Sequence, residues 1–300
     1  MIQEYALEPE LVATWGSPLQ YRFFMQQFGG AQGRLVSRYP KRWAQKVWDS
    51  FSGGNDLDRT RLVELLRYLQ TSTVQRKNPA WDDSLGTWLE NAVREHSRYP
   101  FRAILARHNP NNRPEVIIED ALTTSAKPQW NNPHGMAVHR KAEDMAAAVE
   151  PMLACCSWVR FVDPYISSCK RQYRQSLAAF LKILAAERPV GPPKQIEVHT
   201  NAEGASRGHL HEFFRKILPA GLQVTVYLWR ERANGLRLHN RYILTDLGGV
   251  SFPHGLDCGH DGETDDLTRL DSEQYSIRCD QYCPETQAFE AADAPIEIGT

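Results

Sequence analysis

The stretch Leu236-Arg-Leu-His239-Asn-Arg241-Tyr-Ile-Leu-Thr-Asp246-Leu-Gly-Gly249 determines how the C-terminal half of this chain is interpreted. Its centre, Arg241–Thr245, is rich in strand-forming residues, and the glycine pair that follows indicates a turn. Side chains two residues apart in a strand point to the same face, so His239 and Arg241 are expected side by side. An arginine fork can hold two phosphate oxygens, and an imidazole can attack phosphorus or transfer a proton. The pattern therefore predicts a phosphate site that contains a nucleophile.

Strands and helices alternate around this stretch. The apolar patterns predict strands at Trp158–Val162, Gln195–Thr200 and Leu222–Leu228, in addition to Arg241–Thr245. Helical periodicity falls between them, at 138–153, 172–186 and 207–218. Such alternation predicts an α/β fold with a mainly parallel sheet that is covered by helices on both faces. We therefore predict an α/β domain over residues 99–300.

Residues 1–98 favour helices instead. Apolar residues recur at intervals of three and four after Pro18, after Pro40 and again over Leu57–Leu69. Glycine pairs end the first two of these runs. At Tyr99-Pro100 the pattern changes to short strand-like segments. We therefore predict an all-helical N-terminal region over residues 1–98.

The charge of the chain is balanced overall but unevenly distributed. The 300 residues carry a formal net charge of −1, which gives no argument for nucleic acid or membrane. Residues Arg34–Trp48 hold five basic side chains and no acidic one, whereas residues 253–300 hold twelve acidic side chains and two arginines. Basic residues interleaved with Tyr39 and Trp43 suit phosphate and base contacts. The helical spacing of these aromatics favours a packed face with a basic, solvated outer side.

Two features indicate a protein that stays in the cytoplasm. The start of the chain, Met1–Tyr5, lacks the charged and apolar regions of a signal peptide. The longest apolar stretch, Ala146–Val159, is interrupted by Glu150 and is too short to cross a bilayer. We therefore expect no transmembrane segment and a cytoplasmic location.

The six cysteines are expected to be reduced thiols in that compartment. Cys258-Gly-His260, together with Cys279, Cys283 and the nearby His254, offers soft donors for a structural zinc. The Cys-x3-Cys spacing is looser than the usual Cys-x2-Cys. Reduced, partly buried cysteines are favoured over a zinc site, which stays open as the alternative.

The His239-x-Arg241-x4-Asp246 pattern resembles the signature of the phospholipase D superfamily, His-x-Lys-x4-Asp. The resemblance extends over about residues 155–275. A strand ending in a tyrosine-bearing turn, Val159–Tyr165, precedes the motif, and the strand at 222–229 leads toward His239. A glycine-bearing segment, Gly255-Leu-Asp257, follows it. The resemblance implies a mixed sheet flanked by helices on both faces.

The resemblance also implies a metal-independent phosphodiesterase that needs no cofactor. In that chemistry His239 forms a covalent phosphohistidine, Arg241 stabilises the charged phosphorus centre and Asp246 completes the motif. An acidic residue about thirty positions after the histidine orients it in the family, and Glu273 fills that place, with Glu263 as a rival.

Three further residues are expected to bind the substrate. Ser251 and Asp257 are the nearest substitutes for the Ser and Asn that help bind phosphate in the family, and Tyr165 lies in the turn before the motif. The absence of that Ser-x-Asn pair, and Arg241 in place of lysine, leave two functions open. One is catalysis, and the other is phosphate binding without turnover.

The resemblance also implies a second histidine that protonates the leaving group, and family members with one motif per chain usually supply it from a twofold-related protomer. Because this chain has one good motif, the resemblance implies a homodimer in which the two His239 side chains face each other across a twofold axis. The basic N-terminal segment favours nucleic acid, DNA or RNA, over phospholipid, so we predict a nuclease. Stand-alone single-motif members of the family suggest a setting in restriction or phage defence. The alternative is a degenerate module that binds phosphate groups of nucleic acid, lipid or a partner protein within a larger complex.

Overall fold

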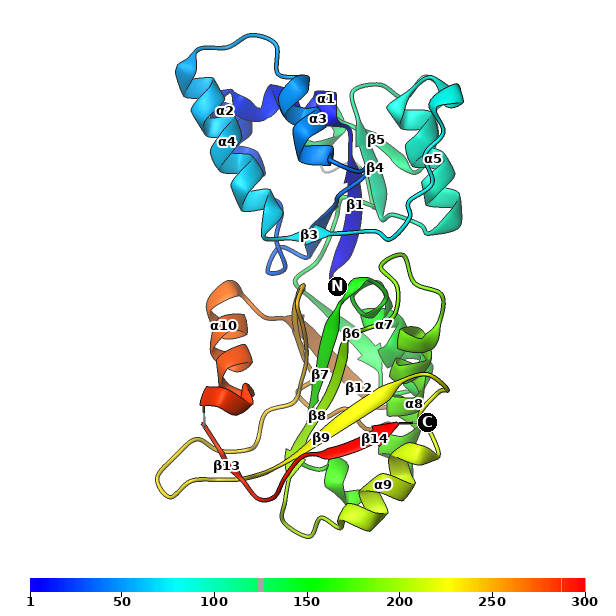
Figure 1. The fold of residues 1–300 in the computed structure, drawn as a ribbon, viewed down its shortest axis with the longest axis vertical. Coiled ribbons are helices and arrows are strands. Elements are labelled where there is room, and N and C mark those ends of the chain that lie inside the picture. Colours follow the sequence, from blue (N-terminus) through cyan, green and yellow to red (C-terminus); the bar gives the residue numbers. More distant parts are fainter. Residues whose placement is uncertain (124–126, 287, 300) are drawn as a thin grey trace. The chain divides into compact units, whose positions relative to one another are not determined.

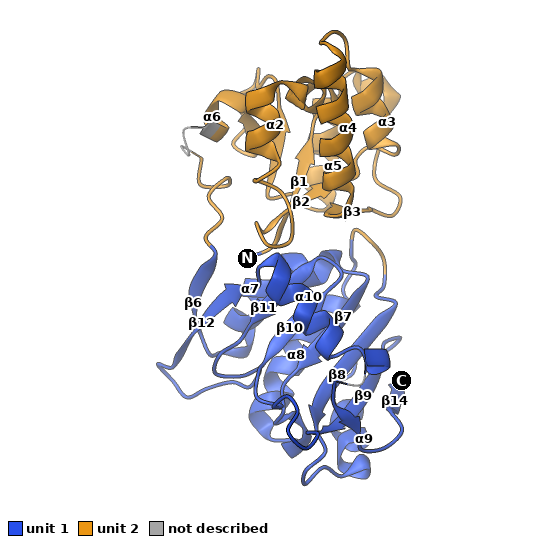
Figure 2. Ribbon diagram, turned by 90° about the vertical axis from the view of Figure 1, so that its left-hand side faces the viewer, with its two compact units in different colours: residues 1, 134–188, 192–300 blue, residues 2–133, 189–191 orange. Residues whose placement is uncertain are grey.

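The computed structural model describes residues 1–123, 127–286 and 288–299. The chain forms two compact units, each with its own β-sheet (Figure 2). The N-terminal unit comprises residues 2–133 and 189–191, and the C-terminal unit comprises residues 1, 134–188 and 192–300. The division near residue 133 lies well after the predicted change at residue 98. The strand-like segments that follow Tyr99-Pro100 therefore belong to the N-terminal unit.

The N-terminal unit is an α/β structure with a parallel sheet in the order β3-β2-β1-β4-β5. Its strands are β1 (Gln3–Leu7), β2 (Arg34–Ser37), β3 (Thr73–Val74), β4 (Ala103–Ala106) and β5 (Val116–Ile118). Its α-helices are α1 (Pro9–Val12), α2 (Pro18–Phe24), α3 (Trp43–Asp49), α4 (Asp56–Gln70), α5 (Trp88–Arg98) and α6 (Glu119–Thr123). Because three strands lie within residues 1–98, the prediction of an all-helical region there needs correction.

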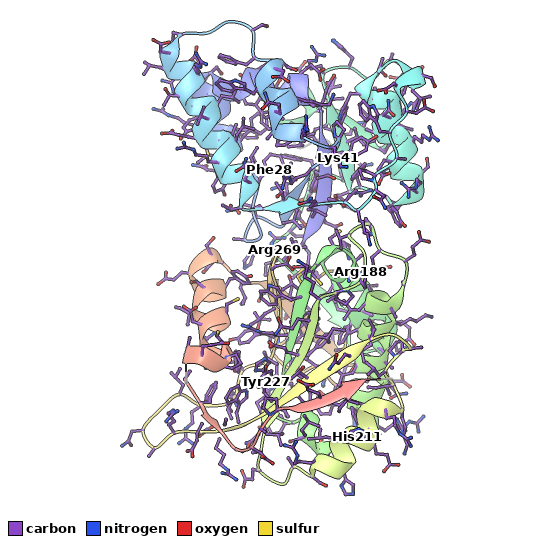
Figure 3. The ribbon with its side chains drawn as sticks, viewed as in Figure 1. Phe28, Lys41, Arg188, His211, Tyr227 and Arg269 are labelled. Atoms are coloured by element: carbon purple, nitrogen blue, oxygen red, sulfur yellow. The ribbon has the colours of Figure 1, made fainter. Side chains whose placement is uncertain are left out.

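The missed strands are short and buried on both faces, so they show no alternation of polar and apolar residues. In β1, Tyr5 and Leu7 enter the core that holds α2, α3 and α4, whereas Ala6 enters a second core with Trp88 of α5. The predicted helical runs after Pro18 and Pro40 and over 57–69 are present as α2, α3 and α4. Phe28, which follows α2, is fully buried in the first core (Figure 3).

The C-terminal unit contains a mixed sheet in the order β13-β9-β8-β7-β10-β11-β12-β6, and β14 also pairs with β9. Strands β7, β8 and β9 run parallel to one another, and the other described pairs are antiparallel. The strands are β6 (Gly135–His139), β7 (Trp158–Val162), β8 (Gln195–Asn201), β9 (Gln223–Arg230), β10 (Tyr242–Thr245), β11 (Gly248–Ser251), β12 (Thr264–Arg269), β13 (Glu290–Ala291) and β14 (Ile296–Gly299).

Helices lie on both sides of this sheet (Figure 1). The two faces can be followed on β7, where Phe161 stacks on Phe180 of α8 with ring centres 5.7 Å apart. Arg160 points the other way and donates from Nη1 to the Cys279 carbonyl of α10 at 3.1 Å. The helices of this unit are α7 (Ala142–Cys155), α8 (Arg171–Ala185), α9 (Arg207–Arg215) and α10 (Ser272–Gln281). The expected mixture of strands and flanking helices is therefore present.

One boundary of this unit differs from the prediction. A helix was expected from residue 138, but residues Gly135–His139 form β6 and α7 begins at Ala142. Strand β6 is the last strand in the sheet order, next to β12, and is largely exposed, so its sequence lacks the apolar pattern of a core strand. Within the described residues, no helix is long and apolar enough to cross a membrane.

Candidate functional site

The His239–Asp246 motif builds the β10–β11 hairpin in the middle of the mixed sheet. Strand β10 pairs antiparallel with β7 on one side and with β11 on the other, and Tyr242 lies opposite both Val162 and Ser251. The open end of the hairpin therefore lies beside the carboxyl end of β7. Ligands of open α/β sheets commonly bind outside the carboxyl ends of the parallel strands. His239 and Arg241 enter the hairpin at this edge.

Arg241 is half-buried, and its hydrogen bonds go to the segment that follows β11. Its carbonyl accepts a hydrogen bond from the Phe252 amide at 3.0 Å, and its Nη1 donates to the Pro253 carbonyl at 3.2 Å. The guanidinium carbon lies 5.3 Å from the ring centre of Tyr165. Among the described residues its buried Nε has no hydrogen-bond partner. The guanidinium is thus held in place while it keeps donors for an anion.

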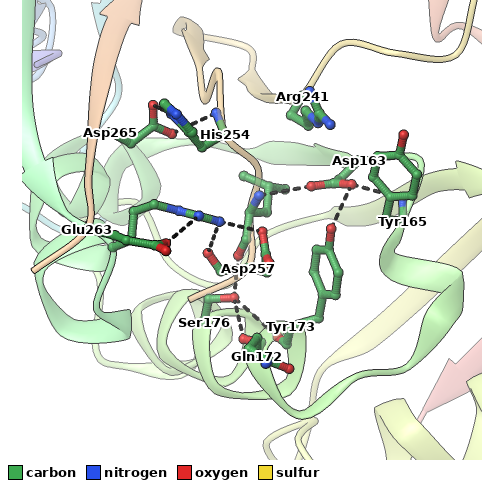
Figure 4. A network of polar contacts seen from close by, with 12 residues as sticks. Asp163, Tyr165, Gln172, Tyr173, Ser176, Arg241, His254, Asp257, Glu263 and Asp265 are labelled. Atoms are coloured by element: carbon green, nitrogen blue, oxygen red, sulfur yellow. Dashed lines mark hydrogen bonds and ion pairs between the residues drawn. The ribbon is translucent and has the colours of Figure 1, made fainter. Parts of the chain in front are cut away.

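Asp163, directly after β7, forms hydrogen bonds with several neighbouring segments (Figure 4). Its carboxylate accepts from the amides of Leu256 and Tyr165, both at 2.9 Å, and from the Tyr173 hydroxyl at 3.1 Å. Asp163 is fully buried, and this burial raises the pKa of its carboxyl although the hydrogen bonds and Arg241 oppose the rise. The bonds fix the Tyr165 turn against the loop that follows β11.

His254 and Asp265 form a second polar pair at the same edge (Figure 4). The imidazole Nδ1 lies 2.9 Å from Asp265 Oδ1, and the His254 amide donates to Oδ2 at 3.1 Å. The Asp265 carboxylate on β12 is fully buried, whereas 62% of the His254 side chain is exposed. Neither residue belongs to the predicted site. One sequence signal could have found Asp265: it lies two residues before Leu267, so in a strand the two side chains share the buried face of β12.

His239 is exposed, and no described residue forms a hydrogen bond or ion pair with its side chain. It stands three residues before Tyr242, and His254 stands three residues after Ser251, the partner of Tyr242. The two histidines therefore flank the same open end of the hairpin, His239 in the segment before β10 and His254 in the segment after β11.

Asp246 lies at the opposite, closed end of the hairpin. Its carboxylate accepts from the Ser157 amide at 2.8 Å and from the Ser157 hydroxyl at 2.6 Å, where β7 begins. The four residues of β10 lie between it and Arg241, so the two residues are about 16 Å apart along the strand. Asp246 thus fixes the start of β7, and the structure does not place it next to His239.

The two acidic candidates for orienting His239 lie elsewhere. Glu273 is in the first turn of α10, and the Tyr275 hydroxyl of that turn donates to the Thr245 carbonyl at the far end of β10. The structure therefore does not bring Glu273 to His239. Its rival Glu263 forms an ion pair with Nη1 of Arg140 at 3.0 Å.

Of the expected substrate-binding residues, Tyr165 packs its ring against the Arg241 guanidinium, and the residue is 51% exposed. Ser251 is half-buried at the end of β11. The carboxylate of Asp257 is held by Nη2 of Arg140 at 2.8 Å. Gly255 has a φ of +125° and lies close to the Asp257 side chain. An added Cβ would stand 2.6 Å from Asp257 Oδ1, so this position favours glycine.

The possible zinc ligands are not gathered in one place. Over the described ranges no group of three or more His, Cys, Asp or Glu side chains could hold a metal ion. Cys258 lies in the loop near Arg140, whereas Cys279 and Cys283 lie at the end of α10. None of the six cysteines, all of which lie in the described ranges, forms a disulfide.

No protein-family model matches this chain, and neither a curated protein nor a solved structure matches it. Its function is therefore inferred from the residues of this site.

Proposed function

We propose that this protein is a metal-independent phosphodiesterase acting on nucleic acid, with His239 as the nucleophile and Arg241 as the phosphate-binding residue. One observation carries the proposal. Arg241 is anchored at the carboxyl edge of β7 with donors to spare, two residues from an exposed histidine.

The chemistry follows from these two side chains. A guanidinium can bind two non-bridging phosphate oxygens and stabilise the charge that develops at phosphorus. A neutral imidazole nitrogen of His239 can then form a bond to phosphorus as the bond to the leaving oxygen breaks. Hydrolysis of the phosphohistidine by water completes the reaction. None of these steps requires a metal ion or a cofactor.

The loop that leads into the motif supports a polyanionic substrate. Residues 230–241 contain four arginines and one glutamate. Arg230 is exposed, and the Arg237 side chain is 83% exposed although it pairs with Glu231 at 2.7 Å. Several arginines along one loop are better suited to bind a chain of phosphates than a single lipid headgroup. A nucleic-acid substrate in turn agrees with a role in restriction or phage defence.

The direct test is incubation of DNA and of RNA with the protein in excess EDTA. We expect cleavage by the wild type and none by His239→Ala. His211→Ala is a matched control, because His211 is another exposed histidine of the same unit, on α9 (Figure 3). No cleavage by the wild type, or equal cleavage by His239→Ala, would overturn the proposal.

A second function is favoured by one observation: Arg241 is anchored, whereas His239 has no polar partner among the described residues to orient it. In that case the site binds phosphate groups of nucleic acid, lipid or a partner protein, within a larger complex, and does not cleave them. Binding that depends on Arg241, without turnover and unchanged by His239→Ala, would identify this function.

A further inference from the structure

We infer that His254, held by the buried carboxylate of Asp265, is the proton donor to the leaving group and acts within the same chain as His239. This inference rests on the proposed phosphodiesterase function. It differs from the homodimer expected from the sequence, because one chain would then carry both histidines that the reaction uses.

The contact between His254 and Asp265 has the geometry of an oriented acid–base pair. A carboxylate can only accept, so Nδ1–H of His254 donates to Asp265 Oδ1 at 2.9 Å, and Nε2 is left facing outward. The second carboxylate oxygen takes the backbone amide of the same residue at 3.1 Å. Asp265 is fully buried and cannot turn toward solvent, whereas the imidazole is mostly exposed. The pair therefore fixes the ring and leaves one nitrogen free to exchange a proton.

The backbone that carries His254 is anchored on both sides by the phosphate site. Directly before it, the Pro253 carbonyl accepts from Arg241 at 3.2 Å. Two residues after it, the Leu256 amide donates to Asp163 at 2.9 Å. The backbone at His254 is thus held between a contact of Arg241 and a contact of Asp163, so the position of the residue does not depend on its side-chain contact alone.

The reaction balances with these groups. The first step uses the imidazolium form of His254, whose Nδ1–H is donated to the Asp265 carboxylate. His239 attacks phosphorus, the phosphorus–oxygen bond to the leaving group breaks, and the leaving alkoxide takes the proton from Nε2 of His254. Neutral His254 then accepts a proton from the attacking water, whose oxygen bonds to phosphorus as the phosphorus–nitrogen bond to His239 breaks. The products are an alcohol and a phosphomonoester, and both histidines return to their initial states.

The experiment compares two substrates in EDTA: an oligonucleotide, whose alkoxide must be protonated, and bis(p-nitrophenyl) phosphate, whose p-nitrophenolate leaves without a proton. We expect His254→Gln to slow oligonucleotide cleavage by about 100-fold or more, the usual range for loss of a general acid, and to change p-nitrophenolate release only a few-fold. Asp265→Asn, as the positioning residue, should show the same selective loss to a smaller extent. His239→Ala should lose both activities.

The outcomes separate the inference from the proposed function. If the wild type cleaves neither substrate, the phosphodiesterase proposal fails. If it cleaves both and His254→Gln lowers both equally, or neither, His254 is not the proton donor. Mixing His239→Ala with His254→Gln tests the location: we expect no recovery of oligonucleotide cleavage, whereas recovery would show that the two histidines come from different chains.

Discussion

Replacing Asp163 with alanine is expected to release the loops around Arg241. The change leaves the buried Tyr173 hydroxyl and the Leu256 amide without their acceptor, and the Tyr165 amide loses its contact as well. Each buried polar group left unpaired costs about 1–3 kcal/mol, and removal of a costly buried charge offsets part of the sum. We therefore expect a loss of about 2–4 kcal/mol in the local free energy of opening.

Amide hydrogen exchange followed by mass spectrometry measures this loss in the peptide that contains residues 253–258. A loss of about 2–4 kcal/mol corresponds to exchange that is roughly 30- to 1000-fold faster. Asp266→Ala is the matched control, because Asp266 is an exposed carboxylate and such surface changes stay within about 0.5 kcal/mol. Unchanged exchange in Asp163→Ala would refute the view that Asp163 holds these loops together.

The pH dependence of Asp163→Asn gives a second check on the same residue. Burial raises the pKa of the Asp163 carboxyl in the folded protein. A raised pKa favours folding below the ordinary carboxyl pKa, and this contribution is lost as pH rises through the folded value. The stability difference between wild type and Asp163→Asn, measured by urea unfolding, should therefore be larger in acid and shrink as pH rises. A difference that grows over this interval would contradict the assignment.

Three other changes have defined outcomes. In a His239→Ala background, Arg241→Ala should weaken oligonucleotide binding by about 10- to 100-fold, measured by fluorescence anisotropy. Arg241→Lys should weaken it less, because lysine keeps the positive charge but loses the paired donors of the guanidinium. Equal affinities of the three proteins would contradict a contact between Arg241 and phosphate. Asp246→Ala should lower the free energy of unfolding in urea by about 1–2 kcal/mol, since Ser157 loses its acceptor, and leave that affinity unchanged. Burial raises the pKa of Cys156 to about 12, so its thiolate at pH 8 is roughly 1000-fold scarcer than that of a free cysteine. N-ethylmaleimide should therefore label Cys156, detected by mass spectrometry, only after unfolding; rapid labelling in the native state would contradict that burial.

Much of the C-terminal unit could be predicted from the sequence because its elements are long enough to show a period. The amphipathic run at Arg171–Ala185 and the apolar strand at Trp158–Val162 are examples. The N-terminal sheet could not be predicted in this way. Strands such as Gln3–Leu7 are short and bury both faces, so no alternation marks them as strands.

The site was predictable only where its residues are neighbours in sequence. Spacing alone puts His239 and Arg241 in the segment just before β10, although β10 itself begins only at Tyr242 and the pair does not lie within the strand. Asp265 meets His254 because β12 pairs with β11, a tertiary pairing that spacing does not encode. Counting about thirty residues from His239 leads to Glu273, but the count does not reveal that the first turn of α10 faces the far end of β10.

Trapping of the covalent intermediate tests the central claim most directly. The protein is mixed with an oligonucleotide in EDTA, quenched in alkaline denaturant because phosphohistidine is labile to acid, digested and analysed by mass spectrometry. We predict an adduct carrying the phosphoryl half of the substrate on the peptide that contains His239, absent from His239→Ala. Cleavage without any such adduct, or an adduct on a residue other than His239, would contradict His239 as the nucleophile.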